Sequence, residues 1–209
     1  MYMIHVTVNP NILLAHESVL QRSNAIYPYK RVEVKTYTLL ANAFLLSLDN
    51  VVMGQLSNLL VFGMVDNEAY TGKRSKKSYN FKHNNLTRFN LSDNGVQVPN
   101  QPLEFDFSNE TPISTRGCLS LFKGTGIHYS DKDHQISKKF FDNGAFLLAF
   151  DLTPDNSYNS TCGSLLNQGT IRIEGRFKDA LKKSVTCIVY AEYDSSIEID
   201  KARNVFTSY

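Results

Sequence analysis

The sequence predicts an all-β fold, an antiparallel β-sandwich or jelly roll with a few short helices in the connections. Short segments of apolar or alternating residues recur along the chain, and turn residues separate them. Helix and strand patterns do not alternate regularly, which disfavours a parallel α/β fold. The 13 Phe and 11 Tyr residues suit strands and a sandwich core. A chain of 209 residues is long enough for one such domain.

Residues 1–30 predict an N-terminal arm with one helix. Asn11–Gln21 follows Pro10, and its pattern is typical of an amphipathic helix. The sandwich is expected over residues 31–200, with residues 201–209 as a C-terminal tail. Its first strand is Arg31–Thr38, where valines alternate with charged residues. We expect Val32 and Val34 to face the core.

The middle of the chain predicts a buried strand followed by a hairpin. Leu59–Val65 (LLVFGMV) is apolar throughout, which indicates a strand buried on both faces. Thr87–Leu91 and Val96–Val98 flank the segment Ser92-Asp93-Asn94-Gly95. Asn-Gly supplies the positive φ angles that a tight turn requires, so this stretch predicts a β-hairpin.

Further strands are predicted in the last third of the chain. Ala145–Leu152 is apolar and ends at the turn Thr153-Pro154-Asp155. Thr170–Phe177 alternates, and its Gly175 indicates a bulge or a close contact. Ser184–Tyr193 is apolar on both faces and predicts a central strand, and Ser196–Asp200 predicts a short final strand.

Two short helices are predicted between strands. Thr111-Pro112 has the residue types of an N-cap and first helical position, so a helix should run from there to near Gly124. Ser137 is expected to cap the N-terminus of a single helical turn that ends at Gly144. The predicted core comprises Val32, Val34, Leu60, Phe62, Leu147, Ala149, Ile171, Ile173 and Val189.

An ordered set of segments resembles one protein family. The stretch Val65–Leu86 (VDNEAYTGKRSKKSYNFKHNNL) resembles the C-terminal half of the Maverick/Polinton major capsid protein, a double jelly roll from virus-like DNA transposons. The other matching segments, in family order, are Asn9–Leu14, Tyr27–Lys35, Asp49–Leu56, Val96–Phe107, Leu121–Gly126, Phe150–Asp155, Gly169–Phe177 and Cys187–Val205. The resemblance selects the jelly roll among the sandwiches. The chain is long enough for only one jelly-roll domain, residues 1–209, whereas the family protein has two.

The resemblance implies a structural protein, or a shortened or domesticated derivative of one, and not an enzyme. Its expected partners are further copies of itself, in a trimer or hexamer-like capsomer, and other capsid proteins. The expected location is the virion and the cell interior. The alternative is a jelly-roll binding module for a glycan or protein, because jelly rolls also host lectin-like sites. Tyrosines in predicted loops would then contact the ligand: Tyr70, Tyr79, Tyr129 and Tyr158.

Composition limits the partners. A net charge of +2 predicts nucleic-acid contact that is at most weak and non-specific. The chain lacks an apolar run long enough to cross a bilayer, and its N-terminus lacks the pattern of a signal peptide, so we expect no membrane contact and no secretion. Cys118, Cys162 and Cys187 lack metal-ligand spacing and predict buried thiols in a reducing compartment.

The candidate site is a basic loop, Lys73-Arg74-Ser75-Lys76-Lys77. A charge run is usually a solvated loop tip that folding does not need, and this is the first expectation. The functional alternatives are a nuclear-import signal, a partner contact or a phosphate contact through Lys73, Arg74, Lys76 and Lys77.

No catalytic, cofactor-binding or metal-binding residue is predicted. His83 lacks a nearby nucleophile and a carboxylate at helical spacing, so it is expected to be a hydrogen-bonded structural histidine. Asp131 and Asp133 lack the central Gly and final Glu of a calcium loop. Asp151 and Asp155 flank a Thr-Pro turn, which they are expected to cap.

Overall fold

The computed structural model describes residues 6–108, 112–129, 131, 133–155, 158 and 166–207. The chain divides into two units. The terminal unit is Met1–Arg31 with Asp194–Tyr209, and the sandwich unit is Val32–Tyr193. Strands β1 (Ala25–Leu39) and β8 (Val185–Ile199) contribute residues to both units.

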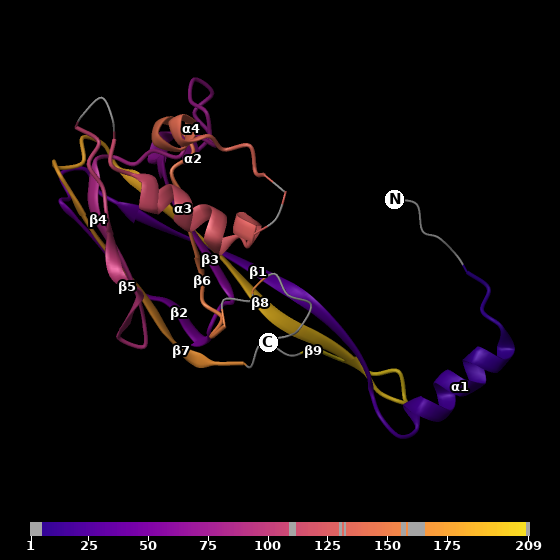
Figure 1. Ribbon diagram of the computed structural model, residues 1–209. Helices are drawn as coiled ribbons and strands as arrows, with labels where there is room; N and C mark the ends of the chain where they lie inside the picture. The colour runs from indigo at the N-terminus through magenta and orange to yellow at the C-terminus, as the bar shows by residue number, and fades with distance from the viewer. Residues whose placement is uncertain are drawn as a thin grey trace. The chain divides into compact units, whose positions relative to one another are not determined.

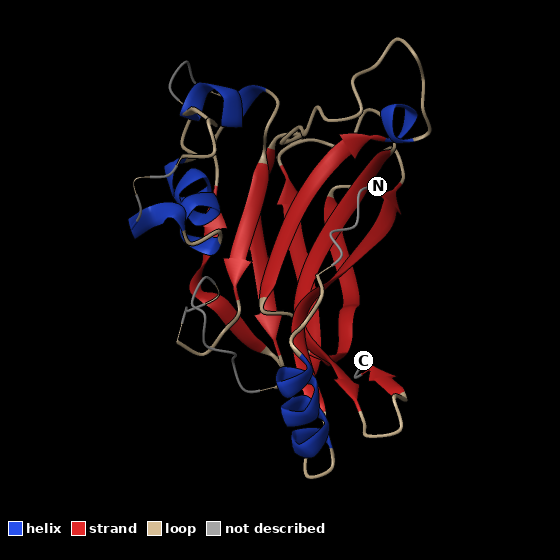
Figure 2. Ribbon diagram, turned by 90° about the vertical axis from the view of Figure 1, so that its right-hand side faces the viewer, coloured by secondary structure: helices blue, strands red, loops and turns tan. Residues whose placement is uncertain are grey.

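The sandwich unit consists of two antiparallel sheets (Figures 1 and 2). One sheet has the order β1-β8-β3-β6, and the other has the order β2-β7-β4-β5. The remaining bounds are β2 Leu45–Gln55, β3 Leu59–Asp66, β4 Leu86–Asp93, β5 Val96–Glu104, β6 Leu147–Asp151 and β7 Gln168–Phe177.

The order of the strands makes this sandwich a jelly roll. β1 lies beside β8, β2 beside β7, β3 beside β6 and β4 beside β5. These nested pairs are those of one long hairpin, and the hairpin is rolled so that its pairs alternate between two sheets. The predicted fold class is therefore confirmed. β8 lies between β1 and β3, as expected of a strand that is apolar on both faces.

Local sequence signals explain the strands that were predicted well. Asn94 and Gly95 have φ angles of 49° and 81°, and they form the turn of the β4–β5 hairpin, where Asp93 pairs with Val96. Gly175 lies where an added Cβ would be 3.1 Å from the Arg88 carbonyl oxygen, so its small size permits close packing of β7 on β4. The hairpin and the close contact are both confirmed.

Aromatic side chains join the two sheets. Phe62 of β3 and Phe89 of β4 are fully buried, and their ring centroids lie 4.9 Å apart. Phe150 of β6 stacks on Phe89 at 5.6 Å. The predicted core positions that are buried are Leu60, Phe62, Ala149, Ile171, Ile173 and Val189, whereas Leu147 is half-buried against this core.

The prediction for β1 is wrong about which face is buried. Val32 and Val34 are 46% and 58% exposed, while the alternate residues, including Glu33 and Lys35, are half-buried. The Lys35 Nζ donates to the Val51 carbonyl oxygen at 3.0 Å, beside an irregularity in the pairing of β2. A long lysine stem covers apolar surface at the rim while its charged end satisfies this carbonyl. The predicted alternation of β1 between two faces is confirmed, but the face assigned to the core is the exposed one.

Helices occupy the connections of the sandwich unit: α2 (Asn67–Tyr70), α3 (Thr115–Gly124), η1 (Ile127–Tyr129) and α4 (Lys138–Asn143). The Ser137 hydroxyl accepts from the Phe140 amide, which confirms the predicted cap of α4. The predicted start of α3 is wrong, because Ser114 is its N-cap and Ile113 pairs with Asp106 in a bridge. Thr111 lies outside the described residues. α3 packs on β6, where an added Cβ on Gly124 would be 2.5 Å from the Ala149 backbone.

The terminal unit contains α1 (Pro10–Leu20) and β9 (Val205–Thr207). α1 confirms the predicted helix to within a residue at each end, and Asn9 caps it by accepting from the Asn11 amide at 3.0 Å. The prediction of a separate strand at Ser196–Asp200 is wrong. β8 continues to Ile199, and β9 is the last strand, with Val205 paired to Ile199. None of the α1 residues is buried.

Candidate functional site

The basic loop lies in the β3–β4 connection, directly after two acidic residues. Asp66 ends β3 and is the N-cap of α2, but its side chain makes no capping hydrogen bond. Glu68 lies in the first turn of α2. Both carboxylates are therefore available to the lysines that follow them in the chain.

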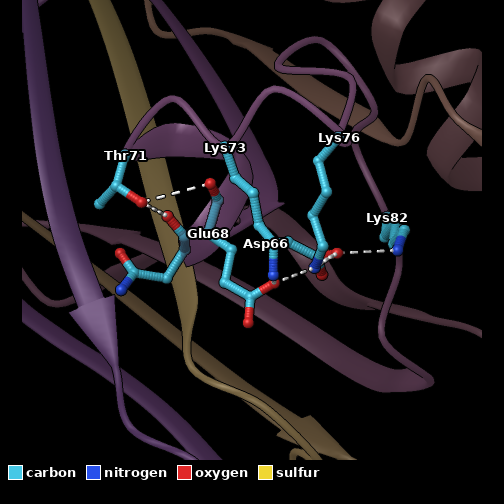
Figure 3. Close-up of polar contacts among 7 residues, drawn as sticks. Asp66, Glu68, Thr71, Lys73, Lys76 and Lys82 are labelled. Carbon is cyan, nitrogen blue, oxygen red and sulfur yellow. Dashed lines mark hydrogen bonds and ion pairs between the residues drawn. The ribbon is translucent and has the colours of Figure 1, made fainter.

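An ion-pair network connects these groups, and Figure 3 shows it. The Asp66 Oδ2 lies 2.9 Å from the Lys76 Nζ and 3.1 Å from the Lys82 Nζ. The Glu68 Oε2 lies 2.9 Å from the Lys76 Nζ and 3.1 Å from the Lys73 Nζ. Lys76 thus bridges two carboxylates, which fixes the loop against the end of β3.

The network shifts the titration of its members. Burial alone would raise the pKa of Asp66, but hydrogen bonds from Lys76 and Lys82 outweigh it, so the pKa lies below its usual value. Hydrogen bonds from Lys76 and Lys73 lower the pKa of Glu68 to about 2, and Lys183 adds to this effect. The pKa of Lys76 is raised by its hydrogen bonds to Glu68 and Asp66. All three groups are charged at neutral pH.

The backbone of the loop is folded as well. The Lys73 amide donates to the Glu68 carbonyl at 3.0 Å, and the Lys76 amide donates to the Lys73 carbonyl at 2.9 Å. Gly72 has a φ of +90°, which only glycine adopts without strain. The expectation of a wholly solvated loop tip is wrong for Lys76, whose side chain is only 22% exposed. Arg74 and Lys77 are exposed, as expected of a loop tip.

A cavity of about 490 Å³ lies beside this network. The β3–β4 connection forms one wall, and the β7–β8 connection forms the other. The lining residues are Asp66, Lys76, Lys82, Asn84, Asn85, Asp179, Ala180, Leu181, Lys182, Lys183 and Val185. Four of them are lysines and two are aspartates, so the lining carries an excess of positive charge.

His83 has a structural role. Its ring stacks on Phe107 with centroids 3.7 Å apart, and its Nδ1 accepts from the Asn85 amide at 3.0 Å. Burial lowers the pKa of His83, while Asp142 opposes that shift. The imidazole is therefore neutral at physiological pH, and the prediction of a hydrogen-bonded structural histidine is confirmed. His128 is exposed.

A second polar cluster lies between α3 and α4, and two of its members, Ser114 and Asp142, are buried. The Ser114 hydroxyl donates to Asp142, and the Lys138 Nζ lies 2.8 Å from both the Ser114 Oγ and the Asp142 Oδ2. A serine beside a lysine can act as a nucleophile with its base. Ser114 is only 1% exposed, however, so its hydroxyl is out of reach of a substrate. This cluster ties the start of α3 to α4.

The remaining predicted groups lie apart from one another. Asp151 accepts from the amide and hydroxyl of Thr153 at 2.9 and 2.6 Å, which confirms that it caps its turn. Cys118 and Cys187 are buried and unpaired, and Cys162 lies outside the described residues. Among the residues with described positions, no cluster of three or more His, Cys, Asp and Glu could hold a metal. No helix of the described chain has the length and apolar character to cross a bilayer.

The tyrosines of the alternative binding site differ in exposure and in contacts. Tyr70 and Tyr79 are 51% and 86% exposed. The Tyr158 hydroxyl instead donates to Glu192, which also accepts from Tyr190 at 2.5 Å. Burial and this carboxylate raise the pKa of Tyr158. The Tyr129 side chain lies outside the described residues. Tyr70 and Tyr79 thus lie in the β3–β4 connection, whereas Tyr158 is bound by Glu192 of β8.

Sequence reasoning found the lysines of the loop and missed their partners. Asp66 and Glu68 precede the lysines by five to ten positions, and a loop that turns back on itself brings such neighbours together. The closeness of Asp66 and Glu68 to the lysines in the sequence could therefore have identified them as partners. Lys182 and Lys183 join the same cavity from a connection about 100 residues further along the chain, which the sequence alone did not indicate.

Two known proteins resemble this chain. An uncharacterised protein of Caenorhabditis elegans is 24% identical over 189 residues, which cover 90% of this chain and 45% of that protein. A chain in the 3.5 Å cryo-EM structure of the Sputnik virophage shares the fold with a TM-score of 0.50 and 13% identity, over 88% of this chain and 39% of that chain. The chain thus spans less than half the length of either protein. No known family profile matches it.

Proposed function

We propose that this chain is a jelly-roll building block of a virus-like capsid, of the Maverick/Polinton type or derived from it. The observation that carries the proposal is the nested strand order β1-β8-β3-β6 and β2-β7-β4-β5, in a fold shared with a chain from the structure of a virus particle. The ordered segments that resemble the Maverick/Polinton capsid protein support the more specific assignment. In this role the protein works by assembly and catalyses no reaction, and its location is the virion.

Exposed apolar residues in the terminal unit support an assembly role. Its large hydrophobic side chains that are exposed are Val6, Val8, Ile12, Leu13, Leu14, Val19, Ile26, Tyr27, Val205 and Phe206. Leu13 and Leu14 of α1 are 54% and 65% exposed. Apolar side chains that stay exposed over several neighbouring residues commonly mark an interface. We propose that these residues contact another subunit.

The proposed partners are copies of the chain and other capsid proteins. In the resembled family, three double jelly rolls form a pseudo-hexagonal capsomer. This chain contributes one jelly roll, so a trimer or a hexamer-like ring is the expected assembly. A closed ring requires a heterologous contact in which two different surfaces of the subunit meet. Nucleic acid is at most a weak and non-specific ligand in this proposal, because the net charge is only +2.

Sedimentation velocity over a wide concentration range tests the assembly role. We expect a species larger than a monomer, and we expect the double variant Ile12→Ser/Leu13→Ser to dissociate it. Met53→Ser is the matched control, because Met53 is 67% exposed but lies on β2 of the sandwich unit. A wild-type protein that sediments as a monomer throughout, or equal behaviour of the two variants, would count against an interface at α1.

A binding module remains the second candidate, and one groove favours it. The outer face of the sheet β2-β7-β4-β5 carries a polar groove of about 740 Å³. Its lining includes Asn90, Gln97, Arg172 and Glu174, whose amide and charged groups are suited to sugar hydroxyls. The Asn90 Oδ1 and Gln97 Nε2 atoms are buried and lack hydrogen-bond partners among the described residues. Glycan-array binding that Asn90→Ala abolishes would support this function over assembly.

A further inference from the structure

The cavity beside the basic loop has two rigid walls. The Asn67 amide donates to the Ser184 carbonyl at 3.1 Å, and the Lys178 amide donates to the Asn85 carbonyl at 2.8 Å. These bonds join the β3–β4 connection to the β7–β8 connection at both sides of the cavity. The Leu181 amide also donates to the Ala43 carbonyl at 3.0 Å, which holds the second wall against the rest of the sandwich unit. A ligand would therefore meet a preformed site.

The four lysines that line the cavity differ in whether they form ion pairs. Lys76 and Lys82 lie in ion pairs with Asp66. Lys182 and Lys183 are exposed, and neither forms an ion pair within the described part of the chain. Lys183 has a longer-range electrostatic effect on Glu68. Two ammonium groups at the mouth of the cavity are thus available to an incoming anion.

The lining of the cavity also includes apolar residues. Leu181 and Val185 line it and are 4% and 2% exposed over the whole residue, and Ala180 lies beside them. A ligand that fits combines negative charges with a chain that tolerates apolar contact. An acidic peptide has both properties. A volume of about 490 Å³ is within the usual range for ligand pockets and holds a few residues of extended peptide.

Nucleic acid fits the cavity less well. Proteins that bind single strands stack bases on aromatic side chains, and no aromatic residue is among those described as lining the cavity. The observations therefore favour a short acidic peptide.

We infer that the cavity between the β3–β4 and β7–β8 connections binds a short acidic peptide segment of a partner protein, with Lys182 and Lys183 as its principal contacts. The Lys76–Asp66–Lys82 ion pairs act as positioning groups, because they hold the first wall in place. This inference goes beyond the capsid proposal and does not depend on it. A monomeric protein would present the same cavity.

Fluorescence anisotropy with labelled octaglutamate tests the inference, with octaglutamine as the uncharged control. We expect octaglutamate to bind in a salt-dependent manner and octaglutamine to bind much more weakly. The double variant Lys182→Gln/Lys183→Gln should weaken binding about fivefold or more, since it removes two ion pairs to the peptide. The charge-matched control Arg74→Gln/Lys77→Gln removes two exposed cations outside the cavity lining and should change affinity by less than about twofold.

Thermal melting of each variant checks that the fold is intact, and Lys182→Glu provides a second variant with a larger expected loss. Three results would overturn the inference. The first is no binding of octaglutamate to the wild-type protein. The second is an equal loss in the cavity variant and the control variant. The third is tighter binding of a thymidylate dodecamer than of octaglutamate, with the same dependence on Lys182 and Lys183, which would make the cavity a nucleic-acid site.

Discussion

Replacing Phe62 with alanine removes the side chain that contacts both sheets. Phe62 is 0% exposed, and its ring lies 4.9 Å from that of Phe89 in the opposite sheet. Its neighbours across β3 are Leu148 and Val189, both buried. The change leaves a cavity at the centre of the sandwich, where rigid strands on all sides limit collapse.

The expected cost follows from area and cavity terms. A buried Phe side chain removes about 150–200 Å² of apolar surface from water, worth roughly 4–5 kcal/mol at about 25 cal/mol per Å². The retained Cβ lowers this figure, and the cavity raises it. We therefore expect a loss of about 3–5 kcal/mol, in line with other buried Phe→Ala changes.

Urea unfolding followed by far-ultraviolet circular dichroism measures this loss. With a slope of about 2–3 kcal/mol per M, the transition midpoint should fall by roughly 1–2.5 M. Phe44→Ala is the matched control, because Phe44 is 57% exposed, and it should cost less than about 1 kcal/mol. A loss below about 1 kcal/mol for Phe62→Ala would refute the assignment of this residue to the centre of the core.

Other changes test the packing and charges of the sandwich unit. Gly124→Ala should destabilise by about 1–3 kcal/mol, because its Cβ would lie 2.5 Å from the Ala149 backbone, and thermal melting against the exposed Leu119→Ala change on α3 measures it. Lys76→Gln should lower the melting temperature more than Lys77→Gln, since only Lys76 bridges two carboxylates; equal effects would show that the network contributes nothing. The pKa of Glu68 is lowered from 4.5 to about 2 in the folded protein. Its contribution to stability is therefore complete above the pKa of the unfolded chain and is lost as the pH falls from about 4.5 toward 2. Glu68→Gln should flatten that part of the pH–stability curve. Burial raises the pKa of Cys187 to about 12, so mass spectrometry after alkylation of the native protein at pH ~8 should find Cys187 unmodified.

Local patterns in the sequence were sufficient for much of the fold. The Asn94-Gly95 turn, the apolar β3 strand and the Ser137 cap are each determined by neighbouring residues, and all three were predicted. The buried face of β1 was predicted wrongly. An alternating pattern defines two faces of a strand, but it does not show which face meets the other sheet. Lys35 lies on the inward face with Tyr37 and Leu39, which pack on the core, and its Nζ donates to the Val51 carbonyl of β2 in the other sheet.

The site shows the same division between local and distant signals. The basic loop was visible as a run of charge, and its carboxylate partners, Asp66 and Glu68, lie close enough in the chain to have been found. The second wall of the cavity, formed by the β7–β8 connection, could not be predicted from the sequence. In the sequence Lys182 and Lys183 are an ordinary pair of surface lysines. Only the folded jelly roll places them at the cavity, where the β7–β8 connection lies beside the β3–β4 connection.

Electron microscopy of the purified chain across a range of concentrations tests the capsid role most directly. We expect closed particles, with class averages showing threefold or sixfold rings of jelly rolls, or larger shells built from them. These particles should disappear in the Ile12→Ser/Leu13→Ser variant and persist in Met53→Ser. A single monomeric species at every concentration and salt would contradict the proposal that the chain assembles as a capsid building block.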